Sequence, residues 1–267
     1  MLKQRVLTAL VLVPLVIWSI FGGHALAFVL LSGAIVTVGA WEWARLMEWS
    51  QVMQVGYALF LLASMMPLAT PACFHGHQYL FFLAVPGWLW ALRQVINYPE
   101  PGVWQHPWVL PVLGWGLLVP SWLALIDLNA MSPWWLMYLL LLVWGADTGA
   151  YFAGRAWGHR KLAPDVSPGK TVEGLLGGLS LTLVVMMAVG WFRHLQGERL
   201  LAFIGISLLT VLASVLGDLL ESMFKRYRGI KDSGGIFPGH GGALDRIDSL
   251  TAAAPIFMAG WLLAGGF

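Results

Sequence analysis

The residues best suited to chemistry in this sequence are concentrated between positions 217 and 248. This stretch holds five acids, five bases, one His and seven glycines. The chain as a whole is 59% hydrophobic and only 10% charged, and long apolar runs flank the stretch on both sides. Ionisable groups beside such runs are costly and usually face a cavity or a partner. We therefore interpret the stretch as a site that handles a metal ion and phosphate groups.

The start of this stretch predicts one polar helix face. Asp218 is followed by Glu221, Ser222 and Lys225 at offsets of three, four and seven residues, which places all four on one side of a helix. Asp218 directly follows an apolar run, where an acid usually serves a site. A salt bridge at the helix end, to Lys225 or Arg226, is the plainer alternative.

Two further acids, Asp245 and Asp248, stand three residues apart at the start of the next apolar run. A single Asp there is explained by capping and by the helix dipole. Two on one face, opposite Asp218 across a Gly-rich turn, favour a divalent-cation site. Mg²⁺ prefers oxygen ligands, usually one or two carboxylates with water and substrate phosphates.

The turn between these helices carries Lys231, Asp232 and the sequence Gly-His-Gly-Gly, residues 239–242. Glycines let backbone amides approach an anion, and the bases are suited to phosphate oxygens. A basic loop that binds lipid headgroups nonspecifically explains the bases, but not the His and the glycines. The role of His240 stays open between phosphate donor, base and structural hydrogen bonder.

A second polar segment spans residues 167–174. Its Gly-Lys-Thr resembles part of a P-loop, but Pro164 occupies the position of the required glycine and no strand is expected before it. Ser167, Lys170 and Thr171 still suit a phosphate cradle, because backbone amides and the dipole point outward at a helix start. Glu173, in the first turn, joins the candidate substrate contacts.

Small residues near these positions predict close helix packing. Gly174 and Gly178 form a GxxxG pattern, which we interpret as a helix contact. Asp147 lies late in another apolar run among small residues. An unpaired charge is unlikely at such a position, so Asp147 is expected to line the site or to pair with a base such as Arg155.

The composition indicates an all-α polytopic membrane protein. Mean hydropathy is +0.76 over 267 residues, and the apolar runs are continuous rather than alternating. The single Cys73 excludes an intramolecular disulfide and a cysteine zinc cluster. The first run is expected to be a retained span rather than a signal peptide. The nine expected spans are 6–21, 25–41, 54–70, 78–92, 109–126, 134–153, 172–192, 200–220 and 249–266.

Charge placement predicts the topology. With nine spans, 13 of the 15 Lys and Arg residues fall on the side of the N-terminus, which the positive-inside rule places in the cytoplasm. Nine of the 13 acids lie after residue 146. We therefore expect residues 1–130, with spans one to five, to be a membrane scaffold and residues 131–267, with spans six to nine, to be catalytic. The polar connections 153–171 and 221–248 share the cytoplasmic face and are expected to form one site.

These motifs resemble a known family. Four segments resemble the signature of the phosphatidate cytidylyltransferases, also called CDP-diacylglycerol synthases. They are Ser222-Met223-Phe224-Lys225-Arg226, Lys231-Asp232, Pro238-Gly239-His240-Gly241-Gly242 and Asp245-Arg246-Ile247-Asp248. Residues 144–158 and 161–174 resemble two further stretches of that family. The first half of the chain matches only in general character.

The resemblance implies an inner-membrane enzyme that joins CTP and phosphatidate into CDP-diacylglycerol and releases pyrophosphate on the cytoplasmic side. It also implies Mg²⁺, a second cation (K⁺) and a homodimer. By match to the signature, the metal carboxylates are Asp218, Asp245 and Asp248. The other catalytic candidates are Lys225, Arg226, Lys231, Asp232 and His240. The substrate-binding candidates are Ser167, Lys170, Thr171, Glu173, Ser222, Gly241, Gly242, Arg246 and Asp147.

Two other functions fit parts of the pattern. A CTP-dependent lipid kinase moves the γ-phosphoryl group, so it forms CDP rather than pyrophosphate. A transporter of an anionic substrate predicts polar residues in both halves and broken-helix symmetry, whereas the acids here concentrate late in the chain. A CDP-alcohol phosphotransferase is disfavoured because its DG-x2-AR core is missing from the sequence. No nucleic-acid partner is expected.

Overall fold

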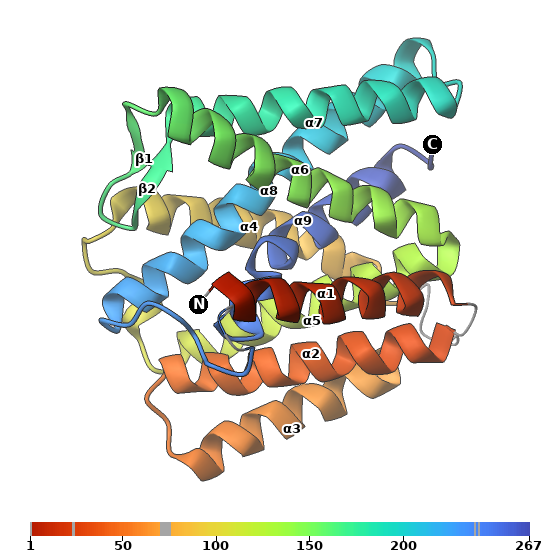
Figure 1. Ribbon diagram of the computed structural model, residues 1–267. Coiled ribbons are helices and arrows are strands. Elements are labelled where there is room, and N and C mark those ends of the chain that lie inside the picture. Colours follow the sequence, from red (N-terminus) through yellow and green to blue (C-terminus); the bar gives the residue numbers. More distant parts are fainter. Residues whose placement is uncertain (1, 23–24, 70–75, 238, 240) are drawn as a thin grey trace.

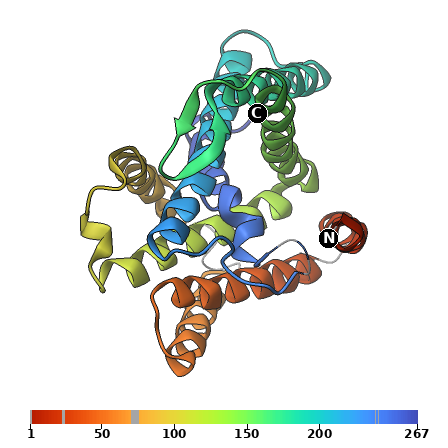
Figure 2. The same ribbon diagram turned by 60° about the vertical axis from the view of Figure 1, so that its left-hand side comes forward.

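The computed structural model describes residues 2–22, 25–69, 76–237, 239 and 241–267, which form a bundle of long helices (Figures 1 and 2). The helices are α1 (Leu2–Phe21), α2 (Ala25–Leu46), α3 (Gln51–Leu68), α4 (Tyr79–Asn97), the 3-10 helix η2 (Val103–Gln105), α5 (Val109–Met131), α6 (Pro133–Trp157), α7 (Val172–Phe192), α8 (Gly197–Tyr227) and α9 (Leu244–Leu263). Two short antiparallel strands, β1 (Lys161–Ala163) and β2 (Ser167–Thr171), form a hairpin between α6 and α7.

Seven of these helices, α2 to α8, are long and apolar enough to cross a membrane. In α1 the apolar stretch identified among the described residues is Leu10–Phe21, and Val6, Leu7 and Ala9 precede it in the sequence. Among the described residues α9 falls outside this set, and three charged residues lie in its first five positions. The predicted helical, polytopic architecture is confirmed, whereas the count of nine spans stays a prediction.

Helix α8 is longer than a membrane crossing requires. Its 31 residues extend over about 46 Å at 1.5 Å per residue, against about 30 Å for the hydrocarbon core. The predicted span 200–220 therefore continues as helix to Tyr227. Asp218 and Lys225 consequently lie on one unbroken helix, as the spacing predicts.

Helices α6 and α7 pack closely through small residues, which confirms the interpretation of the GxxxG pattern. A Cβ added at Gly178 would lie 2.7 Å from the carbonyl oxygen of Ala146, and one at Gly149 would lie 2.6 Å from that of Gly177. The hairpin that joins these helices corrects the expectation that no strand precedes Gly169. Gly169 itself lies within β2, so it does not form a P-loop turn.

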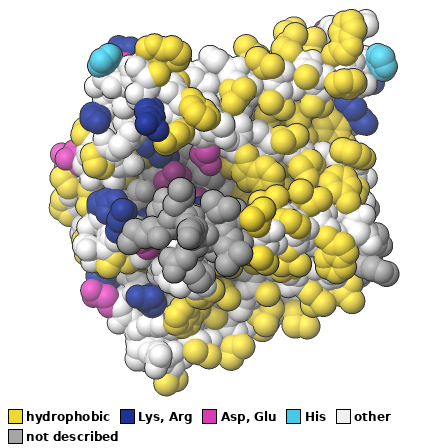
Figure 3. Space-filling model, in the orientation of Figure 1, with side chains coloured by type: hydrophobic (Ala, Val, Ile, Leu, Met, Phe, Trp, Pro, Cys, Tyr) yellow, Lys and Arg dark blue, Asp and Glu magenta, His cyan; other side chains and the backbone are white. Residues whose placement is uncertain are grey.

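The ends of the helices gather the charged residues. Lys and Arg side chains are concentrated at the end of the bundle where the hairpin lies, with acidic side chains between them, and apolar side chains cover most of the remaining visible face (Figure 3). Helix α9 packs against α8, α5, α4 and α2. The charged start of α9 is thus surrounded by helices from both halves of the chain.

Candidate active site

The predicted polar face of α8 is present. The Ser222 hydroxyl donates a hydrogen bond to Asp218 Oδ1 at 3.1 Å, and Lys225 Nζ lies 2.9 Å from Glu221 Oε2. Glu221 and Lys225 are 4% and 7% exposed. A buried ammonium and carboxylate at this distance form a charge-assisted hydrogen bond, so the end of α8 carries a rigid polar cluster.

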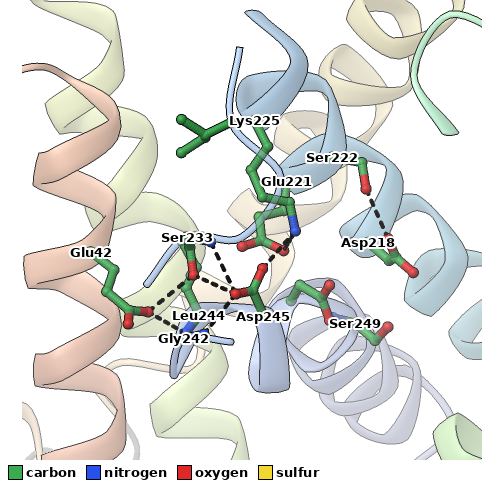
Figure 4. Close-up of polar contacts among 12 residues, drawn as sticks. Glu42, Asp218, Glu221, Ser222, Lys225, Ser233, Gly242, Leu244, Asp245 and Ser249 are labelled. Carbon is green, nitrogen blue, oxygen red and sulfur yellow. Dashed lines mark hydrogen bonds and ion pairs between the residues drawn. The ribbon is translucent and has the colours of Figure 1, made fainter. Parts of the chain in front are cut away.

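Lys225 joins this cluster to α9, because its Nζ also lies 2.7 Å from Asp245 Oδ1. The second oxygen of Asp245 accepts hydrogen bonds from Ser233 N at 3.0 Å, Ser233 Oγ at 3.0 Å and Gly242 N at 2.7 Å (Figure 4). Asp245 therefore ties α8, α9 and both arms of the loop between them. Both of its oxygens are engaged by the protein.

Asp248 stands one helical turn further along α9 and accepts a hydrogen bond from Ser249 N at 2.6 Å. It lies close enough to Asp218, Glu221 and Lys225 to interact with them electrostatically. The structure therefore brings Asp218 close to Asp248, the second acid of α9, as a cluster of like charges, whereas Asp245 joins this cluster through Lys225. Such a cluster is stabilised by a cation or by bases.

The hairpin brings the second polar connection to the same place. Lys170 Nζ lies 2.7 Å from Asp218 Oδ2, and Arg226 Nε donates to the Val166 carbonyl at 3.3 Å. Lys170, Asp218 and Arg246 also interact electrostatically with Asp147 of α6. The two polar connections of the chain thus meet at one charged cluster.

Arg155 does not pair with Asp147, which was one of the two expectations for that acid. Its guanidinium donates to the Tyr151 hydroxyl at 3.0 Å, and within the described ranges no ion pair joins it to Asp147. The alternative, that Asp147 lines the site, is the one that the geometry favours.

The other candidates of the hairpin segment have local partners. Thr171 is buried and caps α7, since its Oγ1 accepts a hydrogen bond from Gly174 N at 3.0 Å. Glu173 accepts bonds from the His159 and Arg160 amides. Ser167, at the start of β2, is half-buried. These contacts hold the hairpin in shape beside Lys170.

The loop after α8 contains the remaining candidates. Lys231 and Asp232 are exposed. Gly241 packs against Asp245, because a Cβ there would lie 2.6 Å from Asp245 Oδ2. His240 lies outside the described residues. Lys231 and Asp232 therefore border the cluster on the solvent side.

Glu42 belongs to this region and is absent from the predicted set. It lies in α2, is fully buried, and accepts hydrogen bonds through Oε2 from Leu244 N at 2.8 Å and from Ser233 Oγ at 3.1 Å. A carboxylate inside the apolar run 25–46, near its end, is the signal that points to it. We overlooked it because the first 130 residues were interpreted as scaffold.

Comparison with known proteins shows to which family the chain belongs. A family model described as the cytidylyltransferase family matches residues 3–263. The chain belongs to the cytidylyltransferase family. It is 46% identical to the phosphatidate cytidylyltransferase of Pseudomonas aeruginosa over 97% of this chain and 96% of that protein. It is 42% identical to that of Haemophilus influenzae over 96% and 97%, and 31% identical to that of Bacillus subtilis over 95% of each chain.

The cytidylyltransferase match extends further than the sequence motifs. The resemblance of the motifs covers only parts of the second half of the chain, whereas the family model also covers the first half, including Glu42. The region that matches the family therefore includes the N-terminal helices that contact α9. Glu42 can be part of the site of such an enzyme.

The cluster fits the chemistry of a divalent cation, which the sequence resemblance leads us to expect. Within the part of the chain that the structure describes, no three Asp, Glu, His or Cys side chains are arranged to hold a metal ion. Mg²⁺ needs only one or two carboxylates when substrate phosphates complete its shell. Glu221 Oε1 is buried and accepts no hydrogen bond from an N–H or O–H group of the described residues, and the Glu221 carboxyl lies against that of Asp248. This surplus of acidic oxygen donors suits a hard cation.

An apolar cavity of about 830 Å³ lies beside the hairpin. It is lined by α4, α8, α9 and the hairpin turn, with Trp88, Leu162, Val166, Leu219 and Leu263 among its walls. The turn residues that line the cavity lead directly into β2, which carries Lys170. One wall of the cavity therefore belongs to the same hairpin as Lys170.

Proposed function

We propose that this chain joins CTP and phosphatidate into CDP-diacylglycerol and releases pyrophosphate. The observation that carries the proposal is the contact between Lys170 and Asp218, which unites the hairpin with the acids of α8 and α9 in one cluster at the end of membrane helices. Relatives named phosphatidate cytidylyltransferase align over nearly the whole chain. A cluster at such an end suits one soluble substrate and one lipid substrate.

The reaction needs no nucleophile from the enzyme. An oxygen of the lipid phosphate forms a bond to the α-phosphorus of CTP, the bond from that phosphorus to the bridging oxygen breaks, and pyrophosphate leaves. The charge that develops on the phosphates is neutralised by bases, in an arrangement set up before the reaction. Lys170, Arg226, Lys231 and Arg246 are the bases that we assign to this task.

Mg²⁺, when bound, neutralises phosphate charge and orients the leaving group. We assign Asp218 and Asp248 as its principal carboxylates, with Asp245 as the third acid of the set. Asp245 also organises the protein, since Lys225 and Ser233 occupy its oxygens. Lys225 is buried between two acids and keeps them in place. We also propose that a second cation, such as K⁺, binds at the site.

The apolar cavity is proposed to receive an acyl chain of phosphatidate. Its lining is almost wholly hydrophobic and its volume of about 830 Å³ suits a lipid chain better than a nucleotide. Leu209 lines the cavity and is 60% exposed, so Leu209→Trp narrows it without disturbing the core. We expect a raised KM for phosphatidate and an unchanged KM for CTP, with Leu183→Trp on α7 as the control. Equal KM values for both variants would contradict the assignment.

The proposed topology has nine crossings, a cytoplasmic N-terminus and a cytoplasmic site in the inner membrane. The gathering of Lys and Arg at the hairpin end supports this orientation (Figure 3). A reporter fused after Phe267 is expected to be extracytoplasmic. A cytoplasmic signal would refute nine crossings. A homodimer is also proposed, and light scattering of the purified protein in detergent tests it.

The deciding assay uses purified protein with labelled CTP, phosphatidate and Mg²⁺. Equal amounts of pyrophosphate and CDP-diacylglycerol are expected. Formation of CDP with a phosphorylated lipid would indicate a lipid kinase instead. Uptake of an anionic solute by vesicles containing the protein, without any product, would indicate a transporter.

A further inference from the structure

Glu42 is a charged side chain that the proposed reaction does not use. It is fully buried in α2, and its Oε1 has no hydrogen-bond partner among the described residues. No Lys or Arg of the described ranges forms an ion pair with it. Burying a carboxylate without a basic partner is costly. A stable fold alone does not account for an acid at this position.

Glu42 caps helix α9 from 202 residues away. The residue before the helix is Ala243, which has no side chain that can accept a bond from the free amides of the first turn. Glu42 Oε2 accepts the bond from Leu244 N instead, at 2.8 Å. A carboxylate at a helix N-terminus also interacts favourably with the helix dipole. The start of α9 therefore depends on α2.

Ser233 connects Glu42 to Asp245. Its Oγ lies 3.1 Å from Glu42 Oε2 and 3.0 Å from Asp245 Oδ2, and its backbone amide donates to the same oxygen of Asp245 (Figure 4). Gly242 lies against the Glu42 carboxylate, since a Cβ there would lie 2.4 Å from both of its oxygens. A displacement of Glu42 would therefore be transmitted to Asp245.

We propose that Glu42 is a positioning residue for the reaction. It holds Ser233 and the first turn of α9, and thereby sets where Asp245 and Asp248 stand, without touching substrate. The kinetic tests of this inference rest on the proposed function, whereas the structural tests need only the geometry.

The test is Glu42→Gln, which keeps the size of the side chain and removes its charge. Leu244 N and Ser233 Oγ both donate to Oε2, so the carbonyl oxygen of Gln can accept both bonds, but as a neutral acceptor it holds them more weakly than a carboxylate. The amide nitrogen of Gln then takes the place of Oε1, where no described residue offers it a hydrogen bond. Removing a buried charge also relieves its desolvation cost. We expect an unchanged or higher melting temperature, a kcat at least about tenfold lower and a KM for CTP within about twofold. A purely structural role predicts a lower melting temperature and a loss of activity that follows the loss of folded protein.

Hydrogen exchange supplies a readout that does not depend on activity. In Glu42→Gln the peptides containing Ser233 and Leu244 are expected to exchange faster, while peptides of α6 and α7 are unchanged. If the unsubstituted protein forms no CDP-diacylglycerol, the proposed function fails and the exchange comparison still decides the role of Glu42. Unchanged exchange and unchanged kcat in an active enzyme overturn the inference alone.

A double-variant cycle tests the route through Ser233. Ser233→Ala is expected to lower kcat, and the double variant with Glu42→Gln is expected to lose less than the product of the two single losses. Full multiplication of the two losses would contradict a shared route. Glu48→Gln is the matched control, because it removes an acid from the same segment at a side chain that is 73% exposed. Its kcat is expected to equal that of the unsubstituted protein.

Discussion

The two polar connections that meet at the site are stabilised in different ways. In the hairpin, β1 pairs with β2, Thr171 caps α7, and Glu173 accepts bonds from amides 13 and 14 residues away. In the loop between α8 and α9, Ser233 binds Asp245, but also Glu42 from 191 residues away. The hairpin is thus shaped mainly by local partners, with Val166 and Lys170 linking it to α8, whereas the loop takes its shape from a distant helix.

This difference determines how each connection should respond to substitution. A hairpin with local partners can absorb a small change by a local adjustment. The loop is fixed between Glu42, Asp245 and the buried Lys225, so a change there alters several charged contacts at once. We therefore expect effects to decrease from the centre of the loop cluster toward the hairpin.

The largest effect is expected for Lys225→Met. The substitution leaves Glu221 and Asp245 buried without their common cation, and loss of one partner from a buried ion pair costs about 3–5 kcal/mol. We expect a large fall in the melting temperature in detergent and no detectable CDP-diacylglycerol synthesis. Lys161→Met, at the exposed start of the hairpin, is the control. Equal melting temperatures for the two variants would refute the central place of Lys225.

Asp245→Ala should separate insertion from turnover. The variant loses contacts to the loop and an expected metal carboxylate, while Lys225 keeps Glu221 as a partner. We expect protein that is inserted in the membrane and nearly inactive. Membrane fractionation together with the CDP-diacylglycerol assay measures both properties, and near-normal activity would contradict the assignment of Asp245.

Asp218→Asn tests the contact between the two connections. In the ion pair with Lys170, the Lys170 side chain is 26% exposed and the Asp218 side chain 29%. Loss of such a partly exposed pair should change the free energy of unfolding by less than about 1 kcal/mol. Turnover is expected to fall at least about a hundredfold, because an expected metal carboxylate is removed. Thermal unfolding and kcat, measured on one preparation, distinguish this result from general destabilisation. A fall in stability as large as that of Lys225→Met would contradict it.

Sequence reasoning found the parts of the site that follow from spacing. Asp218 and Lys225 share a helix face because offsets of three, four and seven residues fix the geometry of any helix. The Gly174–Gly178 pattern likewise identified the contact with α6. The short strands were missed because Lys161–Ala163 and Ser167–Thr171 contain few of the apolar alternations that indicate strands.

Glu42 could not be assigned a role in this way. Its partners, Ser233 and Leu244, are 191 and 202 residues away, and no periodicity links them. Only the packing of α2 against α9 brings them together. The position of an acid within an apolar run was visible in the sequence, but its partner was not.

Glycine substitutions sharpen the comparison within the loop itself. A Cβ at Gly242 would lie 2.4 Å from both Glu42 carboxylate oxygens and from Ser233 Oγ, whereas one at Gly235 meets no atom within 4 Å. Overpacking of this kind destabilises the fold by about 1–3 kcal/mol. It also displaces Glu42 and Ser233, which hold Asp245, so Gly242→Ala is expected to lower kcat about tenfold or more. Gly235→Ala is the matched control and is expected to keep full activity. Equal kcat values would show that the loop is not fixed against Glu42.

The smallest effect is expected in the hairpin, for Gly169→Ala. Gly169 lies in β2, next to Lys170, and a Cβ there meets no atom within 4 Å. Glycine inside a strand is less favourable than alanine by a fraction of a kcal/mol, so stability should stay the same or rise slightly, and kcat should stay within about twofold. The melting temperature and kcat of Gly169→Ala and Gly242→Ala, measured side by side, test the contrast directly. If Gly169→Ala lowered the melting temperature and kcat as much as Gly242→Ala, the hairpin would depend on distant contacts as the loop does. A strand held only by local pairing has space for one added methyl group at this position.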